Sequence, residues 1–198
     1  MKPKIAVVDY EAGNLKSITK ALLKLGADAK ITKNAREIEA ADAVVLPGVG
    51  SYARMRGMKG IEAAVKKAAQ EKPFLGICLG MQLLFEESEE SKEKGFGLMK
   101  GKLEKLKGKV KIPHMGWNNL KIVDRKNPLL KGISEEDYFY FVHSYAVLKS
   151  REEIARCEYG NGFVAAVARG KMFGVQFHPE KSGEKGLRIL QNFLDMIE

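Results

Sequence analysis

Short apolar runs alternate with amphipathic segments along the first half of the chain. Residues 5–8 are apolar throughout, as expected of a buried strand. The segment after them carries apolar residues at helical spacing, at Leu15, Ile18, Leu22 and Leu25. The pattern therefore predicts a strand followed by a helix with one buried face.

The same rhythm continues to about residue 90. The pattern predicts a strand at 29–32, a short helix ending near Ala41, a strand at 43–46, a long helix at 52–71, a strand at 73–77 and a helix at 79–87. Strands that alternate with helices form a parallel sheet with helices on both faces.

Beyond this point strands follow one another with only turns between them. We expect strands at 98–106, 120–123, 138–147, 154–158, 163–169 and 172–177, and a closing amphipathic helix at 186–197. Glycine-containing turns separate several of these strands. The sequence thus predicts an α/β fold: a flavodoxin-like, open, mostly parallel sheet flanked by helices, with an added antiparallel or mixed β section in the C-terminal half.

Length and composition favour a single domain. A chain of 198 residues buries roughly 70% of its unfolded surface, so residues 1–198 are expected to form one unit. The two cysteines, Cys78 and Cys157, lack metal-type spacing, so we expect free thiols, no metal and no cofactor. No apolar run approaches the ~20 residues of a membrane span, and the strand starting by Ile5 leaves no signal peptide. A soluble cytoplasmic protein is expected.

The formal net charge of +9 does not by itself indicate nucleic-acid binding. The lysines are spread along helix faces and turns, whereas a nucleic-acid surface gathers basic and aromatic residues together. We therefore expect no nucleic-acid partner. Positive charge also favours docking of an acidic partner protein or attraction of an anionic substrate.

Cys78 stands where the apolar strand 73–77 meets the helix 79–87, between Gly76 and Gly80. A nucleophile on a sharp strand-to-helix turn needs small neighbours on both sides, because a Cβ there would collide with the adjoining backbone. The helix N-terminus favours a thiolate, and the amide of Leu79 is free to donate to an oxyanion. The alternative is an ordinary buried cysteine beside strand glycines.

His178 follows another apolar strand and is the best candidate for the base. Pro179 fixes the turn, and Glu180 is close enough to reach back to one ring nitrogen, which leaves the other nitrogen for a thiol. In a parallel sheet the carboxyl ends of separate strands share one edge, so Cys78 and His178 are expected to meet there. Taken alone, a His-Pro-Glu sequence at a strand end is more often a simple turn.

The remaining histidines and the second cysteine are expected to be structural. His114 and His143 have no nearby carboxylate to orient them, so we expect structural or substrate-lining roles. Cys157 lies in a β-type segment without an elbow and is expected to be a small buried hydrophobe.

With the elbow, the His-Pro-Glu turn and the Pro-Gly-Val-Gly loop at 47–50, the chain resembles the class I (triad) glutamine amidotransferases from end to end. The resemblance implies a cysteine nucleophile, a histidine that protonates departing ammonia and a glutamate that holds the histidine. These roles fall on Cys78, His178 and Glu180. The implied substrate is L-glutamine, which the resemblance implies is hydrolysed through a thioester.

The resemblance also implies an oxyanion hole and residues that hold glutamine. Backbone amides of Val49 and Gly50 are expected to join that of Leu79 at the oxyanion. Residues expected around the substrate are Gly48, Gln82, Ser144 and Tyr145. The alternatives are an ordinary strand-end turn at 48–50 and a surface glutamine at Gln82.

Within this family, four motifs resemble the glutaminase subunits of imidazole glycerol phosphate synthase: those at 10–15, 113–118, 141–145 and 178–182. The Pro-His-Met-Gly-Trp-Asn run at 113–118 is the most discriminating. The resemblance implies a heterodimer with a (β/α)8 barrel cyclase of histidine biosynthesis, which receives ammonia through a tunnel. The implied partner interface consists of Asn14, Met115, Trp117, Tyr140 and Lys181, with Lys181 pairing to a partner carboxylate.

Three alternatives remain at this point. Trp117 is the only tryptophan, and a lone tryptophan is commonly a core residue. The chain is alternatively a non-catalytic, protein-binding relative, although it keeps Cys78, His178 and Glu180 together. A cysteine hydrolase or peptidase on a similar sheet is the third; such enzymes need neither Gln82 nor the Trp117 segment.

Overall fold

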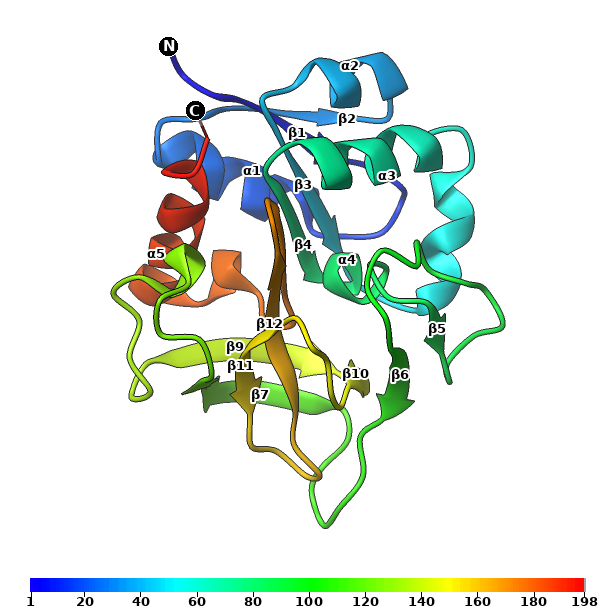
Figure 1. Ribbon diagram of the computed structural model, residues 1–198, viewed down its shortest axis with the longest axis vertical. Coiled ribbons are helices and arrows are strands. Elements are labelled where there is room, and N and C mark those ends of the chain that lie inside the picture. The colour runs from blue at the N-terminus through cyan, green and yellow to red at the C-terminus, as the bar shows by residue number, and fades with distance from the viewer. Residues whose placement is uncertain (198) are drawn as a thin grey trace.

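The computed structural model describes residues 1–197; Glu198, the last residue of the predicted domain, lies outside the described residues. An eight-stranded sheet runs through the molecule in the order β2-β1-β3-β4-β13-β12-β11-β8 (Figure 1). Its parallel strands are β1 (Lys4–Val8), β2 (Asp28–Thr32), β3 (Ala43–Gly48), β4 (Phe74–Cys78) and β13 (Met172–Val175). The antiparallel strands β12 (Phe163–Arg169), β11 (Glu153–Cys157) and β8 (Lys121–Ile122) complete one edge.

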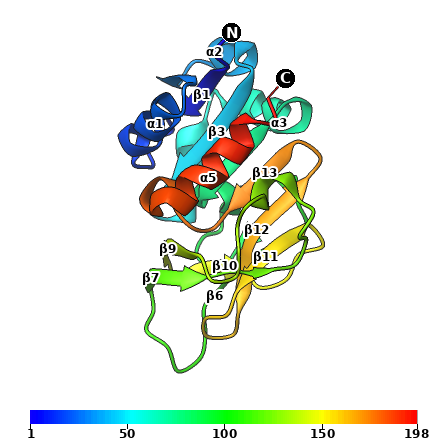
Figure 2. The ribbon, with the colours of Figure 1, turned by 90° about the vertical axis from the view of Figure 1, so that its left-hand side faces the viewer.

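Helices cover both faces of the parallel strands. In β1, Ile5 and Val7 join one hydrophobic core, whereas the alternating residues Ala6 and Val8 join the other. The first core includes the buried sides of α1 (Leu15–Lys24) and α5 (Gly183–Leu194), which lie on the left in Figure 1 and face the viewer in Figure 2. The second includes α2 (Ala35–Ala40) and α3 (Glu62–Glu71).

Two smaller sheets lie below the C-terminal ends of the parallel strands in Figure 1. One joins β10 (Tyr145–Val147), β6 (Lys102–Lys105) and β5 (Glu87–Ser88), and the other pairs β7 (His114–Asn119) with β9 (Tyr138–His143). The prediction of a mostly parallel sheet with an added antiparallel section is therefore confirmed. Of the C-terminal strands, β13, β12, β11 and β8 extend the main sheet, whereas the others form the two smaller sheets.

Several predicted element bounds were wrong. The long helix expected at 52–71 is a 3-10 helix, η1 (Tyr52–Met58), followed by α3, because Gly60 takes a φ of +94° that no helix continues. The strand expected at 138–147 is two strands, β9 and β10, which pair with different partners. The strands expected at 98–106 and 120–123 shrink to β6 and β8.

The helix expected at 79–87 is only α4 (Leu79–Gln82), of 4 residues. The carbonyl oxygens of Leu83 and Leu84 accept hydrogen bonds from the backbone amides of Phe96 and Met99, at 2.7 and 2.9 Å. These non-local bonds replace the helical ones, so the chain turns away after one turn. The helix dipole expected to act on Cys78 therefore comes from the single turn of α4 and not from a longer helix.

Strand β7 was not predicted, because Gly116 and the two asparagines at its end are poor strand formers. Its pairing with β9 supplies the backbone hydrogen bonds that the local sequence did not signal. Among residues 1–197, no helix combines the length and apolar character needed to cross a membrane.

Candidate active site

Cys78 occupies a strained turn between β4 and α4. Its φ of 52° and ψ of −109° are unusual for a residue with a side chain, and they mark the elbow expected at this position. A Cβ on Gly76 would lie 2.6 Å from the carbonyl oxygen of Gly80, and one on Gly80 would overlap the carbonyl oxygen of Leu46. Both glycines are therefore required by close backbone approach.

The ends of three parallel strands converge on this elbow. Gly48, the last residue of β3, is the register partner of Cys78 in β4. On the other side, Val175 of β13 pairs with Ile77, so the chain after β13 arrives beside Cys78. This edge of a parallel sheet is where α/β proteins bind ligands.

The structure brings the three predicted triad residues together. His178 Nδ1 lies 2.8 Å from Glu180 Oε1, with 2% and 4% of the two side chains exposed. Pro179 opens the 3-10 turn η3 (Pro179–Lys181) that carries the carboxylate back to the ring. The imidazole also interacts with the Cys78 side chain. Such an arrangement is suited to supply a nucleophile, a base and an orienting group.

Burial lowers the pKa of His178, but the nearby Cys78 sulfur and the hydrogen-bonded Glu180 carboxylate raise it to about 9. The imidazole therefore carries a proton near neutral pH. A protonated imidazole beside the sulfur holds a proton ready for a leaving group.

His114 and His143 have the opposite electrostatic environment. Burial lowers the pKa of His114 to about 4; burial and the His114 charge lower that of His143 to about 3. The rings pair with each other, with His114 Nδ1 3.3 Å from His143 Nε2. Both rings are neutral at pH 7, so His178 is the best-suited acid–base group among the three histidines of the chain.

A cavity of about 220 Å³ opens beside the Cys78 thiol. Four of the residues predicted around substrate or oxyanion line it: Gly50, Gln82, Ser144 and Tyr145. Gly48 and Leu79 are buried beside the elbow, and Val49 is half-buried between the lining residue Gly50 and Gly48. The other lining residues are Glu90, Pro113, Val142 and His143.

Sequence reasoning missed three polar residues of this site. Gln176 donates from Nε2 to Cys78 Sγ at 3.5 Å, and its only sequence signal is a polar residue in an apolar stretch. Glu90 places a carboxylate in the cavity, but it lies in an acidic run that gives it no distinguishing mark. The hydroxyl of Tyr10 is buried against Gly48, and burial and the Cys78 charge raise its pKa.

The predicted interface residues gather on one face beside the site. Met115 and Trp117 of β7 are 61% and 56% exposed, so the alternative that Trp117 is a core residue is wrong. Trp117 packs edge-on against Tyr140 of β9 with ring centroids 5.9 Å apart, and Lys181 Nζ lies 5.6 Å from the Tyr140 ring centroid. We call Met115, Trp117, Tyr138, Tyr140 and Lys181 the aromatic face.

Asn14 is exposed at the start of α1, a helix that packs against η3 and so lies near Lys181. The aromatic face is tied to the triad through the backbone: the His178 amide donates to the Tyr140 carbonyl at 2.9 Å. Val142, two residues along the same strand, presents its carbonyl oxygen 3.9 Å from Cys78 Sγ.

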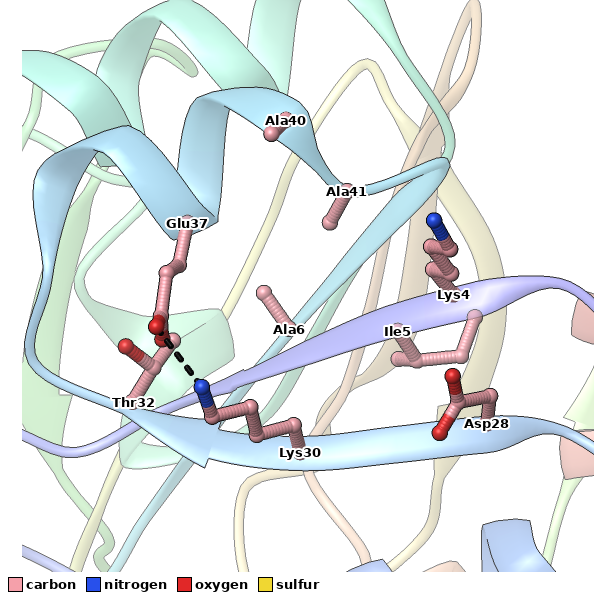
Figure 3. Close-up of a pocket in the computed structure, with 9 residues that line it drawn as sticks. All are labelled: Lys4, Ile5, Ala6, Asp28, Lys30, Thr32, Glu37, Ala40 and Ala41. Carbon is pink, nitrogen blue, oxygen red and sulfur yellow. Dashed lines mark hydrogen bonds and ion pairs between the residues drawn. The ribbon is translucent and has the colours of Figure 1, made fainter.

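A second cavity, of about 240 Å³, lies between α2 and the strands β1 and β2 (Figure 3). Lys4 and Asp28 begin those strands, so the cavity reaches toward the end of the sheet opposite to Cys78. Its most prominent polar contact is a solvent-exposed ion pair between Lys30 and Glu37, at 2.7 Å. Its lining contains neither a cysteine nor a histidine, and the Cys78 cavity is therefore the candidate active site.

Comparison with known proteins agrees with this geometry. The family described as Glutamine amidotransferase class-I matches residues 6–197. Proteins described as imidazole glycerol phosphate synthase subunit HisH are 46% identical in Methanocaldococcus jannaschii, covering 98% of this chain and 100% of that protein, and 48% identical in Caldanaerobacter subterraneus, covering 98% of each. The chain belongs to the HisH family of class I glutamine amidotransferases. The predicted family is thereby confirmed.

Solved structures support the fold of this amidotransferase. PurLQS from Thermotoga maritima superposes with a TM-score of 0.76 at 22% identity and covers 100% of both chains. A glutamine amidotransferase from Thermotoga maritima gives a TM-score of 0.69 at 16% identity, covering 100% of this chain and 98% of that one. At these identities the similarity concerns the fold alone.

The raised pKa of His178 provides a test of its contact with the thiol. In a Cys78→Ser variant the negative sulfur is lost, so the imidazole titration followed by NMR is expected to move below the value of about 9. Cys157→Ser removes the distant buried thiol and serves as the control, with no change in the titration. A midpoint equal in all three proteins would contradict the proposed pairing of His178 with Cys78.

Proposed function

We propose that this chain is the glutaminase subunit of imidazole glycerol phosphate synthase and hydrolyses L-glutamine to L-glutamate and ammonia on Cys78. The observation that carries the proposal is the convergence, from separate strands, of an elbow cysteine and a buried His178–Glu180 pair. Membership of the class I glutamine amidotransferases does not support the alternatives of a non-catalytic relative or a peptidase.

The geometry supports the following steps of the proposed reaction. Sulfur of Cys78 attacks the carboxamide carbon, and the oxygen that becomes negative accepts from the Leu79 amide and from an amide of the Val49–Gly50 loop. The carbon–nitrogen bond then breaks as His178 gives its proton to the nitrogen, which leaves as ammonia. His178 next takes a proton from water, which hydrolyses the thioester to glutamate and frees the sulfur. Glu180 holds the ring throughout.

The cavity suits a small amino acid. Glutamine has a carboxamide at one end and an ammonium and a carboxylate at the other, so its α-carbon end requires polar groups away from Cys78. We place the ammonium on Glu90, whose Oε2 already accepts from the Tyr52 amide at 2.7 Å and is thereby held in place. Gln82, Ser144 and Tyr145 line the same cavity and are proposed to surround the rest of the substrate.

We further propose that the ammonia passes to a (β/α)8 barrel cyclase in a heterodimer, which forms imidazole glycerol phosphate and aminoimidazole carboxamide ribotide. The relatives are described as subunits of this synthase. The aromatic face fits a docking surface, because exposed aromatic anchors concentrate interface energy. Lys181 is proposed to pair with a partner carboxylate, and Asn14 to contact the partner beside it. Because Cys78 must stay reduced, we place the reaction in the cytoplasm.

The proposed function is tested by measuring glutamate release for the chain alone and with the purified cyclase and its nucleotide ligand. We expect the cyclase to stimulate release. Trp117→Ala is expected to weaken cyclase binding about 30-fold or more, since truncating an aromatic anchor costs about 2 kcal/mol or more. Val123→Ala, at a residue 57% exposed outside the aromatic face, is the matched control. Glutamate release that ignores the cyclase would reject this partner; no release in any mixture would reject the glutaminase.

A further inference from the structure

Gln176 is a buried side chain that points at the nucleophile. It is 1% exposed and follows Val175, the register partner of Ile77, so it lies level with Cys78 across the sheet. Its amide nitrogen, Nε2, donates to Cys78 Sγ at 3.5 Å, within the range of a hydrogen bond to sulfur. Neither the triad nor the oxyanion hole includes it.

The orientation of the Gln176 amide is dictated by its neighbours. Gln82 Nε2 donates to the Tyr145 carbonyl oxygen and to Gln176 Oε1, each at 2.9 Å. A backbone carbonyl oxygen can only accept a hydrogen bond, so the group of Gln82 that faces Tyr145 must be its amide nitrogen. The same nitrogen also faces Gln176, so the Gln176 group that faces it must be the acceptor, Oε1. The nitrogen of Gln176 is then left facing the sulfur. A relay of three hydrogen bonds therefore presents a donor to Cys78.

A donor at this position has a consequence for the state of the thiol. Besides the His178 ring, the sulfur has the Val142 carbonyl oxygen at 3.9 Å, an acceptor that interacts favourably with S–H and unfavourably with a thiolate. A hydrogen bond to a charged acceptor is stronger than one to a neutral acceptor, and the difference grows in a buried site. The Gln176 N–H thus opposes the effect of the Val142 carbonyl.

We propose that Gln176 is a catalytic residue that stabilises the Cys78 thiolate by direct N–H donation, and that Gln82 is a positioning residue that fixes the Gln176 amide. This proposal rests on the proposed function, in which Cys78 is the nucleophile. It assigns Gln82 a second task besides lining the glutamine cavity. Removing the donor reduces the fraction of thiolate at a given pH without removing the base.

The test is the pH dependence of Cys78 alkylation by iodoacetamide, measured without glutamine or cyclase in a Cys157→Ser background so that one thiol reports. Gln176→Glu keeps the oxygen that Gln82 needs but replaces the donor with a negative charge. Gln176→Met keeps a similar volume and removes the donor. Both are expected to move the midpoint upward, by about one pH unit for Met and more for Glu.

Two controls separate the relay from a general loss of structure. Gln82→Met is expected to move the midpoint upward by less than Gln176→Met, and the double variant no further than Gln176→Met alone. Gln70→Glu adds the same charge at an exposed helix position and is expected to leave the midpoint unchanged. Glutamine turnover by the unmodified protein with the cyclase is measured in parallel. If the unmodified protein has no turnover, the proposed function is rejected. The alkylation midpoints are measured without glutamine, so they test the role of Gln176 separately. Midpoints in Gln176→Glu, Gln176→Met and Gln82→Met that stay at or below the original value would overturn the role of Gln176.

Discussion

Replacing Cys78 with alanine is expected to lower glutamate formation by about 10⁴-fold or more when the cyclase is present in excess. The reason is that the thioester has no other sulfur to form on: Cys157 is fully buried, and burial and the Glu158 charge raise its pKa to about 12. Triad enzymes that lose their nucleophile keep only the residual catalysis of binding and oxyanion stabilisation. The measurement is glutamate release from glutamine at saturating substrate.

Cys157→Ala is the matched control, because it removes the second thiol of the chain from a β-strand outside the site. Its glutaminase activity is expected to match that of the unmodified protein, although its stability is slightly lower. The Cys78→Ala complex is also expected to make imidazole glycerol phosphate when ammonium is supplied at alkaline pH, where free ammonia is abundant. Glutamate formation that survives in Cys78→Ala would contradict the assignment of the nucleophile.

The sequence allowed the prediction of those parts of the site that depend on backbone geometry. The elbow was predictable because a nucleophile at a strand-to-helix turn demands glycines around it, and Gly76 and Gly80 stand where backbone leaves no space. The meeting of Cys78 with His178 followed from the parallel order of β4 and β13, since such strands end at one edge.

Features set by non-local hydrogen bonds were not predictable in this way. The end of α4 depends on amides that arrive from Phe96 and Met99, and no local signal in the elbow helix announces them. The role of Gln176 depends on which way its amide turns, which Gln82 and Tyr145 decide from other elements. The exposure of Trp117 was inferred from resemblance alone, because a strand with Gly116 in it carries no clear pattern.

Gly80→Ala is expected to be among the most destabilising single methyl additions in the chain, costing about 3 kcal/mol or more of unfolding free energy. The added Cβ would overlap the carbonyl oxygen of Leu46, which belongs to β3 between β1 and β4. Neither backbone is free to retreat, because β3 is hydrogen-bonded on both sides and α4 is bound to β4 by the elbow. When the surrounding backbone cannot move to make room for added atoms, the loss of unfolding free energy is at the upper end of the range for single substitutions.

Urea unfolding followed by circular dichroism measures this cost, with Gly26→Ala as the matched control. Gly26 has nothing within 4 Å of an added Cβ but a φ of +92°, so its substitution reports backbone strain alone, about 1 kcal/mol. Equal losses for the two variants would mean that the elbow has room for a side chain. Glutaminase activity is expected to fall together with stability in Gly80→Ala only. Because residue 80 has no side chain, α4 can lie directly against β3, and this close packing also fixes the position of the Cys78 sulfur.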